Sequence, residues 1–395
     1  MSLNFIDLFS GIGGFHQALK KYDKKSKCVL ACDIDKNCQE VYFDNYNIKP
    51  ESNITELDET TIPDFDILCA GFPCQSFSNA GNKGKFNDGR GKLFYEIIRI
   101  AKHKKPKFMF LENVKHIKKI DNGNVFSKIL SEINKIGYYV KDEETIFELS
   151  PYQLGIPQNR ERVIFVCIRN DIYDSTKKIE LSLPTNPKIN FTKIFEKKKD
   201  TLKYKISDEV ENVLNAWNEI IQVIDTGDKL SPTILCNEFK KKYTKTEFSK
   251  LPKWKQDYIT KNKPIYEKYK SKWDAWSKKY ENLLSKREIY CKLEWQVGPK
   301  KNNDSIWNYF IQLRQSGLRI KKTDYFPTLV ALGQIPIYGK QKRYITPREC
   351  ARLQSFPNSF KIHNSDKVAY KQFGNAVNVD VIHTVIKATL DVYLN

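Results

Sequence analysis

The hydrophobic positions in the first half of the chain fall into short continuous runs, which alternate with longer stretches of helical spacing. The runs are NFIDLF, CVLACDI, DILCAGF, KFMFLENV and RVIFVCI, and the helical stretches include GKLFYEIIRIAKHKK and NVFSKILSEINKIG. Continuous apolar runs are typical of strands buried on both faces, and their alternation with helices indicates βαβ units. The pattern predicts an α/β fold over residues 1–185.

The pattern changes in the middle of the chain, between Asn186 and Tyr325. One stretch there carries aromatic residues at spacings of three and four, namely Tyr266, Tyr269, Trp273, Trp276 and Tyr280. This spacing puts the rings on one face of a helix, which we expect to pack within a small domain of its own. The lysines between them occupy the other faces, where they meet either solvent or phosphate groups.

Charge adds a possible partner to this picture. The 395 residues carry 67 Lys and Arg against 47 Asp and Glu, a net charge of +20. Residues 186–325 alone contain 31 basic and 18 acidic side chains, together with all six tryptophans. Such an excess suggests a polyanionic partner, although the lysine enrichment of an AT-rich genome would contribute to it as well.

Cysteine usage and hydropathy exclude several classes of protein. The nine cysteines form an odd set with no CxxC pair, which fits neither a disulfide framework nor a zinc site. No apolar run approaches the roughly 20 residues of a membrane span, and the N-terminus MSLNFIDLFSG lacks the features of a signal peptide. We therefore expect a cytoplasmic protein without bound metal or membrane contact.

A glycine-rich turn is the first motif with chemistry in it. In FIDLFSGIGGF a short strand leads into Gly11, Gly13 and Gly14 and then into a helical pattern, as in turns that bring backbone close to a nucleotide. A dinucleotide fingerprint would need glycine where this chain has His16. Asp33, at the end of the next strand, can accept hydrogen bonds from ribose hydroxyls. Together, the glycine-rich turn and Asp33 favour a binding site for a nucleoside cofactor without pyrophosphate. The alternative interpretation is structural: an ordinary tight turn with a capping Asp.

The segment GFPCQSFSNAG places Cys74 directly after a proline and a buried strand. A strand end in an open α/β sheet faces the ligand crevice, so the thiol is expected to face the cofactor, beneath a glycine-rich lid that follows it. Other strand ends bring Glu112, Arg160 and Arg162 to the same edge. Their alternative interpretations are structural, with Glu112 as a helix-capping carboxylate and the arginines in surface ion pairs.

One reaction uses a thiol, a carboxyl group and a guanidinium beside a nucleoside cofactor. A cysteine protease is disfavoured, because none of the five histidines lies in a recognisable partner context. A thiolate that adds to carbon 6 of cytosine makes carbon 5 nucleophilic, so that carbon 5 can attack an electrophilic methyl group. A carboxyl group at N3 and an arginine at O2 would stabilise that addition.

The chain resembles a known family, the DNA (cytosine-5)-methyltransferases of bacterial restriction-modification systems. The resemblance rests on six blocks in the family's order: DLFSGIGGF, GFPCQSFSNAG, FLENV, QNRERVIFV, TPRECARLQSFP and YKQFGNAVN. It implies a Rossmann-like S-adenosylmethionine-dependent catalytic domain and a smaller target-recognition domain. Residues 1–185 begin the catalytic domain, 186–327 form the recognition domain, and 328–395 complete the catalytic domain.

The resemblance also assigns roles to single residues. It implies that Cys74 is the nucleophile, that Glu112 contacts N3, and that Arg162 contacts O2 with support from Arg160. S-adenosyl-L-methionine would be held by the residues matching the family's cofactor pocket, namely Phe9, Gly11, Gly13, Gly14, Asp33, Ile34, Asn53, Leu93 and Asn375. Two of these depart from the usual pattern, because the family commonly has an aromatic residue in place of Ile34 and Asp in place of Asn53.

The same resemblance implies double-stranded DNA as partner, with the target cytosine flipped out of the helix. Thr328 and Leu329 match a Thr-Leu pair that the family places at the end of the recognition domain. Candidate DNA contacts near it are Arg314, Arg319, Lys321, Lys322 and Thr328. The enzyme would act as a monomer, with a companion restriction endonuclease acting separately.

Three rival functions remain on the sequence alone. An RNA cytosine methyltransferase would use the same catalytic blocks, but the large basic middle region argues for duplex DNA. A catalytically silent DNA-binding relative is disfavoured by the presence of Cys74, Glu112 and Arg162. A dinucleotide oxidoreductase shares only the sheet and is disfavoured by His16.

Overall fold

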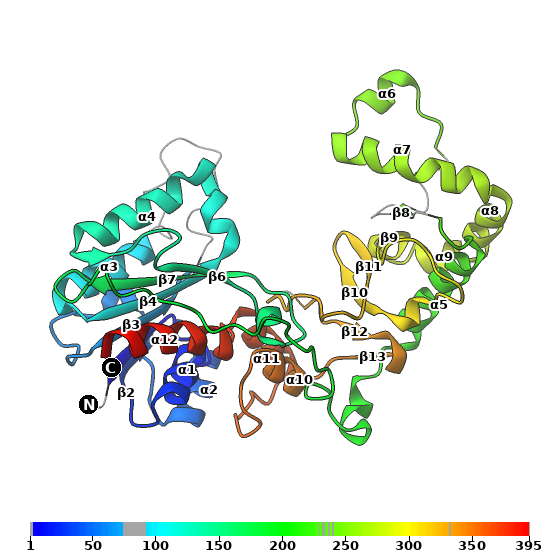
Figure 1. The fold of residues 1–395 in the computed structure, drawn as a ribbon. Helices are drawn as coiled ribbons and strands as arrows, with labels where there is room; N and C mark the ends of the chain where they lie inside the picture. Colours follow the sequence, from blue (N-terminus) through cyan, green and yellow to red (C-terminus); the bar gives the residue numbers. More distant parts are fainter. Residues whose placement is uncertain are drawn as a thin grey trace. The chain divides into compact units, whose positions relative to one another are not determined.

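The structure is a computed structural model that describes residues 3–73, 92–228, 230, 234, 235, 238, 241–331 and 333–394. It consists of two compact units, drawn as a ribbon in Figure 1. Unit 1 comprises Met1–Ile194 and Pro347–Asn395, and unit 2 comprises Phe195–Thr346. Among the helices of the described chain, none is long and apolar enough to cross a membrane.

Unit 1 contains a seven-stranded sheet in the order β2-β1-β3-β4-β7-β5, with β6 also paired to β7. The first four of these strands are parallel, whereas β7 runs antiparallel to β4. The strands are β1 (Asn4–Leu8), β2 (Lys27–Cys32), β3 (Ile67–Gly71), β4 (Phe108–Val114), β5 (Tyr138–Tyr139), β6 (Ile146–Leu149) and β7 (Arg162–Arg169). The prediction of an α/β fold is confirmed.

Helices cover both faces of this sheet, which explains the continuous apolar runs. Alternate strand residues such as Leu68, Met109 and Phe165 pack in one core with α3 and α4, while α1 and α12 pack together against the other face. The helices are α1 (Gly14–Tyr22), α2 (Lys36–Tyr46), α3 (Lys92–Lys104), α4 (Asn124–Lys135), α10 (Pro347–Leu353), α11 (Asp366–Asn375) and α12 (Val379–Leu394). Short 3-10 helices are η1 (Ile54–Glu56), η4 (Lys115–Gly123) and η5 (Pro151–Leu154).

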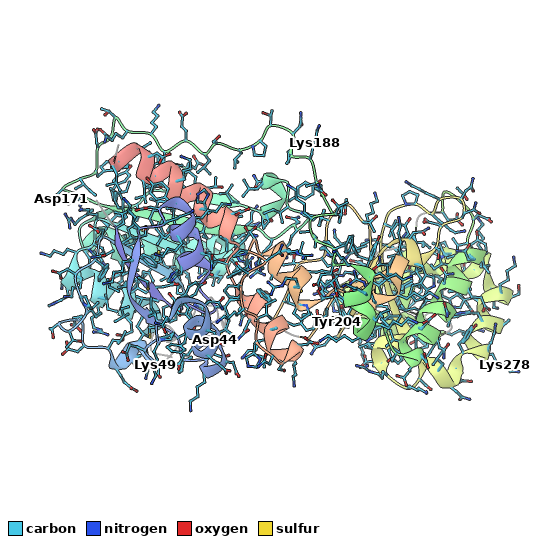
Figure 2. The ribbon with its side chains drawn as sticks, turned by 90° about the horizontal axis from the view of Figure 1, so that it is seen from below. Asp44, Lys49, Asp171, Lys188, Tyr204 and Lys278 are labelled. Atoms are coloured by element: carbon cyan, nitrogen blue, oxygen red, sulfur yellow. The ribbon has the colours of Figure 1, made fainter. Side chains whose placement is uncertain are left out.

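The two units are joined on one side by a long segment after β7 that forms neither helix nor strand up to η6 (Lys198–Tyr204). Asp171 and Lys188 in this segment are labelled in Figure 2, where the stretch between them is drawn as an extended chain. The residues of this segment up to Ile194 belong to unit 1, and those from Phe195 onward belong to unit 2.

Unit 2 contains a six-stranded sheet in the order β13-β12-β10-β11-β9-β8. Its strands pair antiparallel except β9 and β11, which are parallel. They are β8 (Ile234–Leu235), β9 (Lys292–Gln296), β10 (Phe310–Arg314), β11 (Gly317–Lys321), β12 (Ile337–Tyr338) and β13 (Arg343–Tyr344). The remaining elements are α5 (Asp208–Val223), α6 (Lys245–Ser249), α7 (Lys253–Lys268), α8 (Lys270–Lys279), α9 (Glu281–Leu284), η8 (Glu288–Cys291), η9 (Ile306–Asn308) and η10 (Gly339–Gln341).

The aromatic stripe packs within unit 2, as predicted. Trp273 and Trp276 are buried, and Trp276 Nε1 donates to the Ala216 carbonyl of α5 over 2.7 Å. The stripe does not lie on one continuous helix, however, because the chain leaves helical geometry at Tyr269 and Tyr280 and divides into α7, α8 and α9.

The compact units differ from the expected domain boundaries at both junctions. Residues 328–346, which we expected in the last catalytic segment, lie in unit 2, because β12 pairs with β10 and β13 pairs with β12. Residues 186–194 lie in unit 1. Strands of two residues, such as β12 and β13, leave no periodic pattern by which the sequence could locate this boundary.

Candidate functional site

Five strands of unit 1 place candidate site residues at one edge of the sheet. The parallel strands β1 to β4 all end there, and β7 begins there because Val114 at the end of β4 pairs with Arg162. Phe9, Asp33 and Phe72 follow strand ends at this edge. In open α/β sheets the crevice beyond the carboxyl ends of the strands is the usual ligand site.

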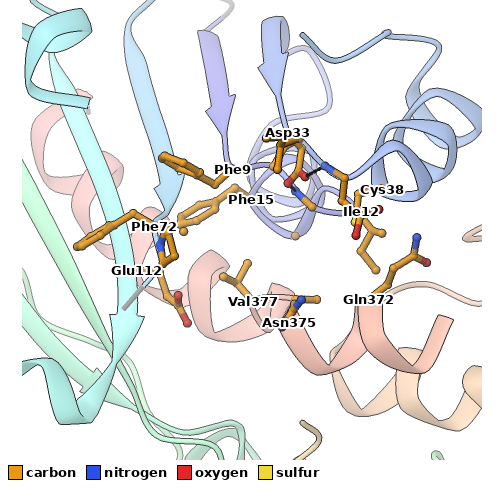
Figure 3. Close-up of a pocket in the computed structure, with 18 of the residues that line it drawn as sticks. Phe9, Ile12, Phe15, Asp33, Cys38, Phe72, Glu112, Gln372, Asn375 and Val377 are labelled. Carbon is orange, nitrogen blue, oxygen red and sulfur yellow. Dashed lines mark hydrogen bonds between the residues drawn. The ribbon is translucent and has the colours of Figure 1, made fainter. Parts of the chain in front are cut away.

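A cavity of about 600 Å³ lies at this edge, within the range of small-molecule sites. Figure 3 shows side chains from the sheet edge and from α11 around it. The lining includes most of the residues predicted from the sequence, namely Phe9, Gly11, Gly14, Asp33, Ile34, Asn53, Leu93, Glu112, Arg160, Arg162 and Asn375. Phe72 and Pro73 line it as well, whereas Cys74 and the expected lid, up to residue 91, lie outside the described residues.

The turn after β1 is held by a carboxylate. Phe9 and Gly11 both have left-handed φ values, 53° and 52°, which is rare for an aromatic residue and turns the chain sharply at the strand end. The Gly11 N–H donates to Asp33 Oδ2 over 2.7 Å, and the Asp35 N–H donates to Asp33 Oδ1 over 2.8 Å. Burial raises the pKa of Asp33, and these two hydrogen bonds oppose that shift.

Gly13 does not reach the cavity, in contrast to Gly11 and Gly14. Its φ is 84°, and a Cβ there would lie 2.4 Å from the ring of Tyr46. Tyr46 Oη in turn lies 3.2 and 3.1 Å from the carbonyl oxygens of Ile12 and Gly13, to which it donates. The glycine at position 13 is therefore required by packing beneath the turn. The contact with Tyr46 was not predicted from the sequence.

A buried polar cluster lies next to this turn. His16 Nδ1 lies 2.8 Å from Tyr42 Oη, and the imidazole stacks on Tyr46 with ring centroids 3.8 Å apart. Burial lowers the pKa of His16 to about 3, with the Lys20 charge acting in the same direction, and burial raises the pKa of Asp7. His16 is thus a neutral packing residue at the position where a dinucleotide fingerprint has glycine.

The C-terminal segment closes one side of the cavity. A Cβ on Gly14 would lie 2.4 Å from Val377 Cγ2, so the glycine lets this segment approach the turn. Gln372 donates to the Asn37 carbonyl over 3.0 Å, and Lys371 pairs with Asp35 at 2.8 Å. These two contacts hold the end of α11 beside the turn, where Asn375 lines the cavity. Gln372 and Val377 line the cavity as well; they were not predicted as site residues, although both lie in the block YKQFGNAVN.

Ile34 and Asn53 line the side of the cavity near Asp33. Ile34 is 78% exposed, so its side chain is open to whatever binds there. Asn53 caps η1, since its Oδ1 accepts from the Thr55 N–H over 3.1 Å while its Nδ2 donates to Glu56 over 2.6 Å. Much of the hydrogen-bonding capacity of the Asn53 amide is therefore used within its own turn.

At the other end of the cavity, Glu112 and Arg162 form an ion pair. Arg162 Nε lies 2.8 Å from Glu112 Oε1, and the side chains are only 16% and 11% exposed. Oε2 of Glu112 accepts no hydrogen bond from any residue of the described chain. The pair is thus held in one geometry with a carboxylate oxygen available toward the cavity.

Arg160 has a different environment from Arg162. Its Nη2 donates to the carbonyls of Gly374 and Ala376 over 2.9 and 3.1 Å, and its backbone N–H donates to Ser150 Oγ over 2.9 Å. Burial, together with the Arg162 charge, lowers its pKa. Arg160 therefore anchors the segment that carries Asn375 against the start of β7.

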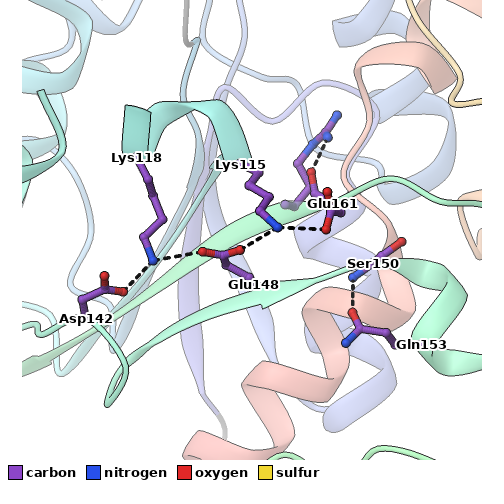
Figure 4. A network of polar contacts seen from close by, with 8 residues as sticks. Lys115, Lys118, Asp142, Glu148, Ser150, Gln153 and Glu161 are labelled. Carbon is purple, nitrogen blue, oxygen red and sulfur yellow. Dashed lines mark hydrogen bonds and ion pairs between the residues drawn. The ribbon is translucent and has the colours of Figure 1, made fainter. Parts of the chain in front are cut away.

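A network of ion pairs includes Glu161, the residue between Arg160 and Arg162 (Figure 4). Lys115 lies 3.1 Å from Glu148 and 3.0 Å from Glu161, and Lys118 joins Glu148 to Asp142. Because Glu161 lies between the two arginines in the sequence, the network fixes the backbone that carries them.

The candidate DNA contacts all lie on or near one hairpin of unit 2. Arg314 ends β10, and Arg319 and Lys321 lie on β11. Arg319 Nε lies 2.6 Å from Glu294 Oε2, and Lys321 Nζ lies 3.5 Å from the ring centroid of Tyr325. Lys322 and Thr328 are exposed.

The sheet order, the glycine turn with its carboxylate, and the paired Glu112 and Arg162 define an α/β protein with a small-molecule cavity at the carboxyl edge of its parallel strands. The family model for C-5 cytosine-specific DNA methylases matches residues 3–391, and the chain belongs to that family. It is a DNA (cytosine-5)-methyltransferase, and family members must flip their target base out of the duplex to reach it.

Similar proteins agree with this assignment. The chain is 34% identical to the Type II methyltransferase M.HhaI of Haemophilus parahaemolyticus, over 97% of this chain and 93% of that protein. It is 33% identical to the Type II methyltransferase M.HpaII of Haemophilus parainfluenzae, over 98% and 89%. Among solved structures, the Entamoeba histolytica methyltransferase EhMeth shares the fold, with a TM-score of 0.58 at 20% identity over 99% and 98% of the two chains.

Proposed function

We propose that the enzyme transfers a methyl group from S-adenosyl-L-methionine to carbon 5 of a cytosine within a specific duplex DNA sequence, through a covalent Cys74 adduct. The observation that carries the proposal is the single cavity shared by Asp33, the Glu112–Arg162 pair and Pro73, the residue before Cys74. The similarity to Type II methyltransferases supports a role as the modification enzyme of a restriction-modification system. A companion endonuclease would act separately, and the methyltransferase would act as a monomer.

The lining of the cavity fits S-adenosyl-L-methionine, which supplies an electrophilic methyl group when it is bound. Asp33 would accept hydrogen bonds from the ribose hydroxyls, because each of its oxygens uses one lone pair on a backbone N–H and retains another. Ile34 would pack near the adenine, with Phe9, Asn53, Leu93 and Asn375 completing the site. Among the described residues no cluster of metal ligands is present, and the proposed reaction uses none.

The catalytic steps follow from the chemistry of cytosine. The Cys74 thiolate would add to carbon 6 while Glu112, carrying a proton, donates that proton to N3 and Arg162 donates hydrogen bonds to O2, which stabilises the charge that develops on the ring. Carbon 5 would then take the methyl group, and the demethylated cofactor would leave as S-adenosyl-L-homocysteine. A base would remove the proton from carbon 5, and the electrons of that bond would restore the ring double bond as the bond between sulfur and carbon 6 breaks and N3 returns its proton to Glu112. The ion pair between Glu112 and Arg162 supports this assignment, because it holds both groups before the base arrives.

The adduct can be trapped with a duplex that carries 5-fluorocytosine at the target position. Fluorine cannot leave carbon 5 as a proton does, so the reaction should stop at a protein–DNA adduct that survives denaturing electrophoresis and requires the cofactor. Cys74→Ser should abolish the adduct, because a serine hydroxyl has a pKa far above that of a thiol. Transfer of labelled methyl groups to duplex DNA rather than transfer RNA would separate the DNA enzyme from its RNA-directed rival.

Cys291→Ser is a matched control, since its thiol donates to the Leu284 carbonyl and a serine hydroxyl can do the same. This variant should form the adduct as the unchanged protein does. An adduct that forms without Cys74, or that peptide mapping assigns to another cysteine, would contradict the mechanism while leaving the family assignment intact.

A further inference from the structure

Helix α7 is fixed to unit 2 along one side and open along the other. Its buried residues are Ile259, Asn262 and Tyr266, and the Tyr266 hydroxyl donates to Asp274 of α8 over 3.0 Å. The helix also packs against β8, the strand at one end of the sheet (Figure 1). This anchoring leaves the outer side of α7 as a firmly held surface that faces solvent.

Two aromatic side chains lie along one edge of that outer side. Trp254 is 57% exposed, and its ring meets the ring of Tyr258 edge-on, with the ring centroids 5.8 Å apart. Among the described residues, neither the indole N–H of Trp254 nor the Tyr258 hydroxyl has a hydrogen-bond partner. A single exposed tryptophan is ordinary on a protein surface, so its meaning depends on the charges around it.

Most of those charges are positive. Residues 245–279, which span α6, α7 and α8, contain 11 lysines and 4 acidic residues, a net charge of +7. Lys253 precedes Trp254, and Lys261 lies two helical turns beyond it on the same side of α7. Both lysines are exposed, with the exposed Asp257 between them in the sequence, and neither has an ion-pair partner in the described chain. The aromatic pair is therefore flanked by two cations without a bound counter-charge.

We propose that this part of α7 binds the sugar-phosphate backbone of duplex DNA beside the sequence that the enzyme reads. The inference rests on the proposed function, in which unit 2 binds the DNA. Lysine and tyrosine side chains donate hydrogen bonds to phosphate oxygens, an indole N–H is a further donor, and such contacts hold a duplex without reading its bases. An acidic protein partner is disfavoured, because lysine is depleted in the core of protein interfaces.

The position of α7 explains why the contact should lie beside the recognised sequence. The candidate DNA contacts of unit 2 lie on or near β10 and β11, and β9 separates β11 from β8. Neighbouring strands lie about 4.8 Å apart, so β8 is roughly 10 Å from β11, the length of about three base pairs. Because α7 packs against β8, a duplex that touches the hairpin needs further base pairs on one side to reach Trp254.

The test measures binding of the full-length protein to two duplexes that share the methylated sequence, which bisulfite sequencing identifies first. One duplex ends about two base pairs beyond that sequence, and the other extends by about ten base pairs, one helical turn, on each side. On the long duplex, Lys253→Gln/Lys261→Gln should make the slope of log affinity against log salt less steep by about 2, since each lost phosphate contact changes it by about 1. On the short duplex the slope should not change.

Two further variants separate charge from contact. Trp254→Ala should weaken binding of the long duplex by about 2- to 10-fold, the effect of one lost hydrogen bond, without changing the salt slope. Asp257→Asn should strengthen binding of the long duplex, because it removes a negative charge beside the phosphates. None of these variants should change which cytosines are methylated, because the contact reads no base.

Lys24→Gln/Lys25→Gln is the charge-matched control. Both lysines are exposed and precede β2, at the opposite edge of the unit 1 sheet from the cavity that must receive the target base. This variant should bind both duplexes as the unchanged protein does. Thermal unfolding of each variant shows whether it folds, so that only folded variants are compared.

Three outcomes would overturn the inference. Equal losses on the short and the long duplex, or a change in site choice, would place α7 on the recognised sequence itself. Unchanged affinity for the long duplex in the lysine and tryptophan variants would leave this surface to another partner, such as an acidic protein. If the unchanged protein neither binds nor methylates duplex DNA, the proposed function itself fails and the inference fails with it. This last outcome is recognised without any variant.

Discussion

At the scale of single residues, Asp33 joins the local structure of the turn to the proposed cofactor site. Each of its oxygens accepts one backbone N–H, from Gly11 and from Asp35, and burial raises its pKa. A carboxylate is suited to this position because both neighbours are donors. An amide would turn its own N–H₂ group toward one of them.

Replacement of Asp33 tests its proposed contact with the ribose. Asp33→Ala should weaken S-adenosyl-L-methionine binding by about 1 to 3 kcal/mol, the scale of a lost hydrogen bond to a charged group. Asp33→Asn should be similarly weak, because it retains only one acceptor oxygen for two N–H donors and the ribose. Titration calorimetry measures both, and an affinity that neither change alters would contradict the proposed role.

His16 gives a prediction about pH. Folding lowers its pKa from an ordinary 6.5 to about 3, so between these values the unfolded chain binds a proton that the folded chain excludes. The stability contributed by neutral His16 is therefore present above pH 6.5 and is lost as the pH falls. Asp7, whose pKa burial raises, acts in the opposite direction, so a variant is needed to isolate His16.

His16→Gln should remove this loss. The unchanged protein should lose about 1.4 kcal/mol of its free energy of unfolding for each pH unit below 6.5, and the variant should not. The difference between the variant and the unchanged protein should therefore shift in favour of the variant by roughly 2 kcal/mol when the pH is lowered from 8 to 5. Urea unfolding at the two pH values measures the difference. His116→Gln, at an exposed position, removes an imidazole that folding does not bury and serves as control. Equal pH dependence in the His16 variant and the unchanged protein would refute the assignment.

At the scale of elements, the sequence predicted those whose pattern is long and uniform. The apolar runs became β1 to β4 and β7, and two helical stretches became α3 and α4. Asp33, Glu112 and Arg162 could be placed together because the ends of neighbouring strands meet at one edge. Tyr46 and Val377 could not be predicted, since their contacts with the glycine turn depend on how α2 and the C-terminal segment pack.

The glycine turn allows a comparison between two left-handed glycines. An alanine at position 11 or 13 would be strained, at roughly 1 to 2 kcal/mol each. Only at position 13 would the new Cβ also meet Tyr46, which should add about 1 to 3 kcal/mol as overpacking. Gly13→Ala should therefore lower the free energy of unfolding more than Gly11→Ala does. Equal losses in urea unfolding would mean that Tyr46 moves aside freely.

At the scale of the whole molecule, the candidate site residues of the cavity and most of the net positive charge belong to different units of the chain. The pocket residues lie in unit 1, while most of the net positive charge and all tryptophans fall in the part of the sequence that forms unit 2. The sequence indicated this division through composition, but the boundary depends on β12 and β13. Their place in the sheet comes from pairing with β10, which residue patterns two positions long do not encode.

The division predicts that recognition can be exchanged as a unit. Replacing Phe195–Thr346 with the corresponding part of a related methyltransferase should change which cytosines are methylated and leave methyl transfer intact, as measured by bisulfite sequencing. A second chimera that exchanges only residues 186–327 should be less stable. It keeps β12 and β13 of this chain but sets them against a foreign β10, which disrupts the pairing of Ile311 with Ile337 and the contact between Phe310 and Tyr338. Unchanged site choice in the first chimera would contradict the recognition role of unit 2, and equal thermal stability of the two would contradict the boundary at Thr346.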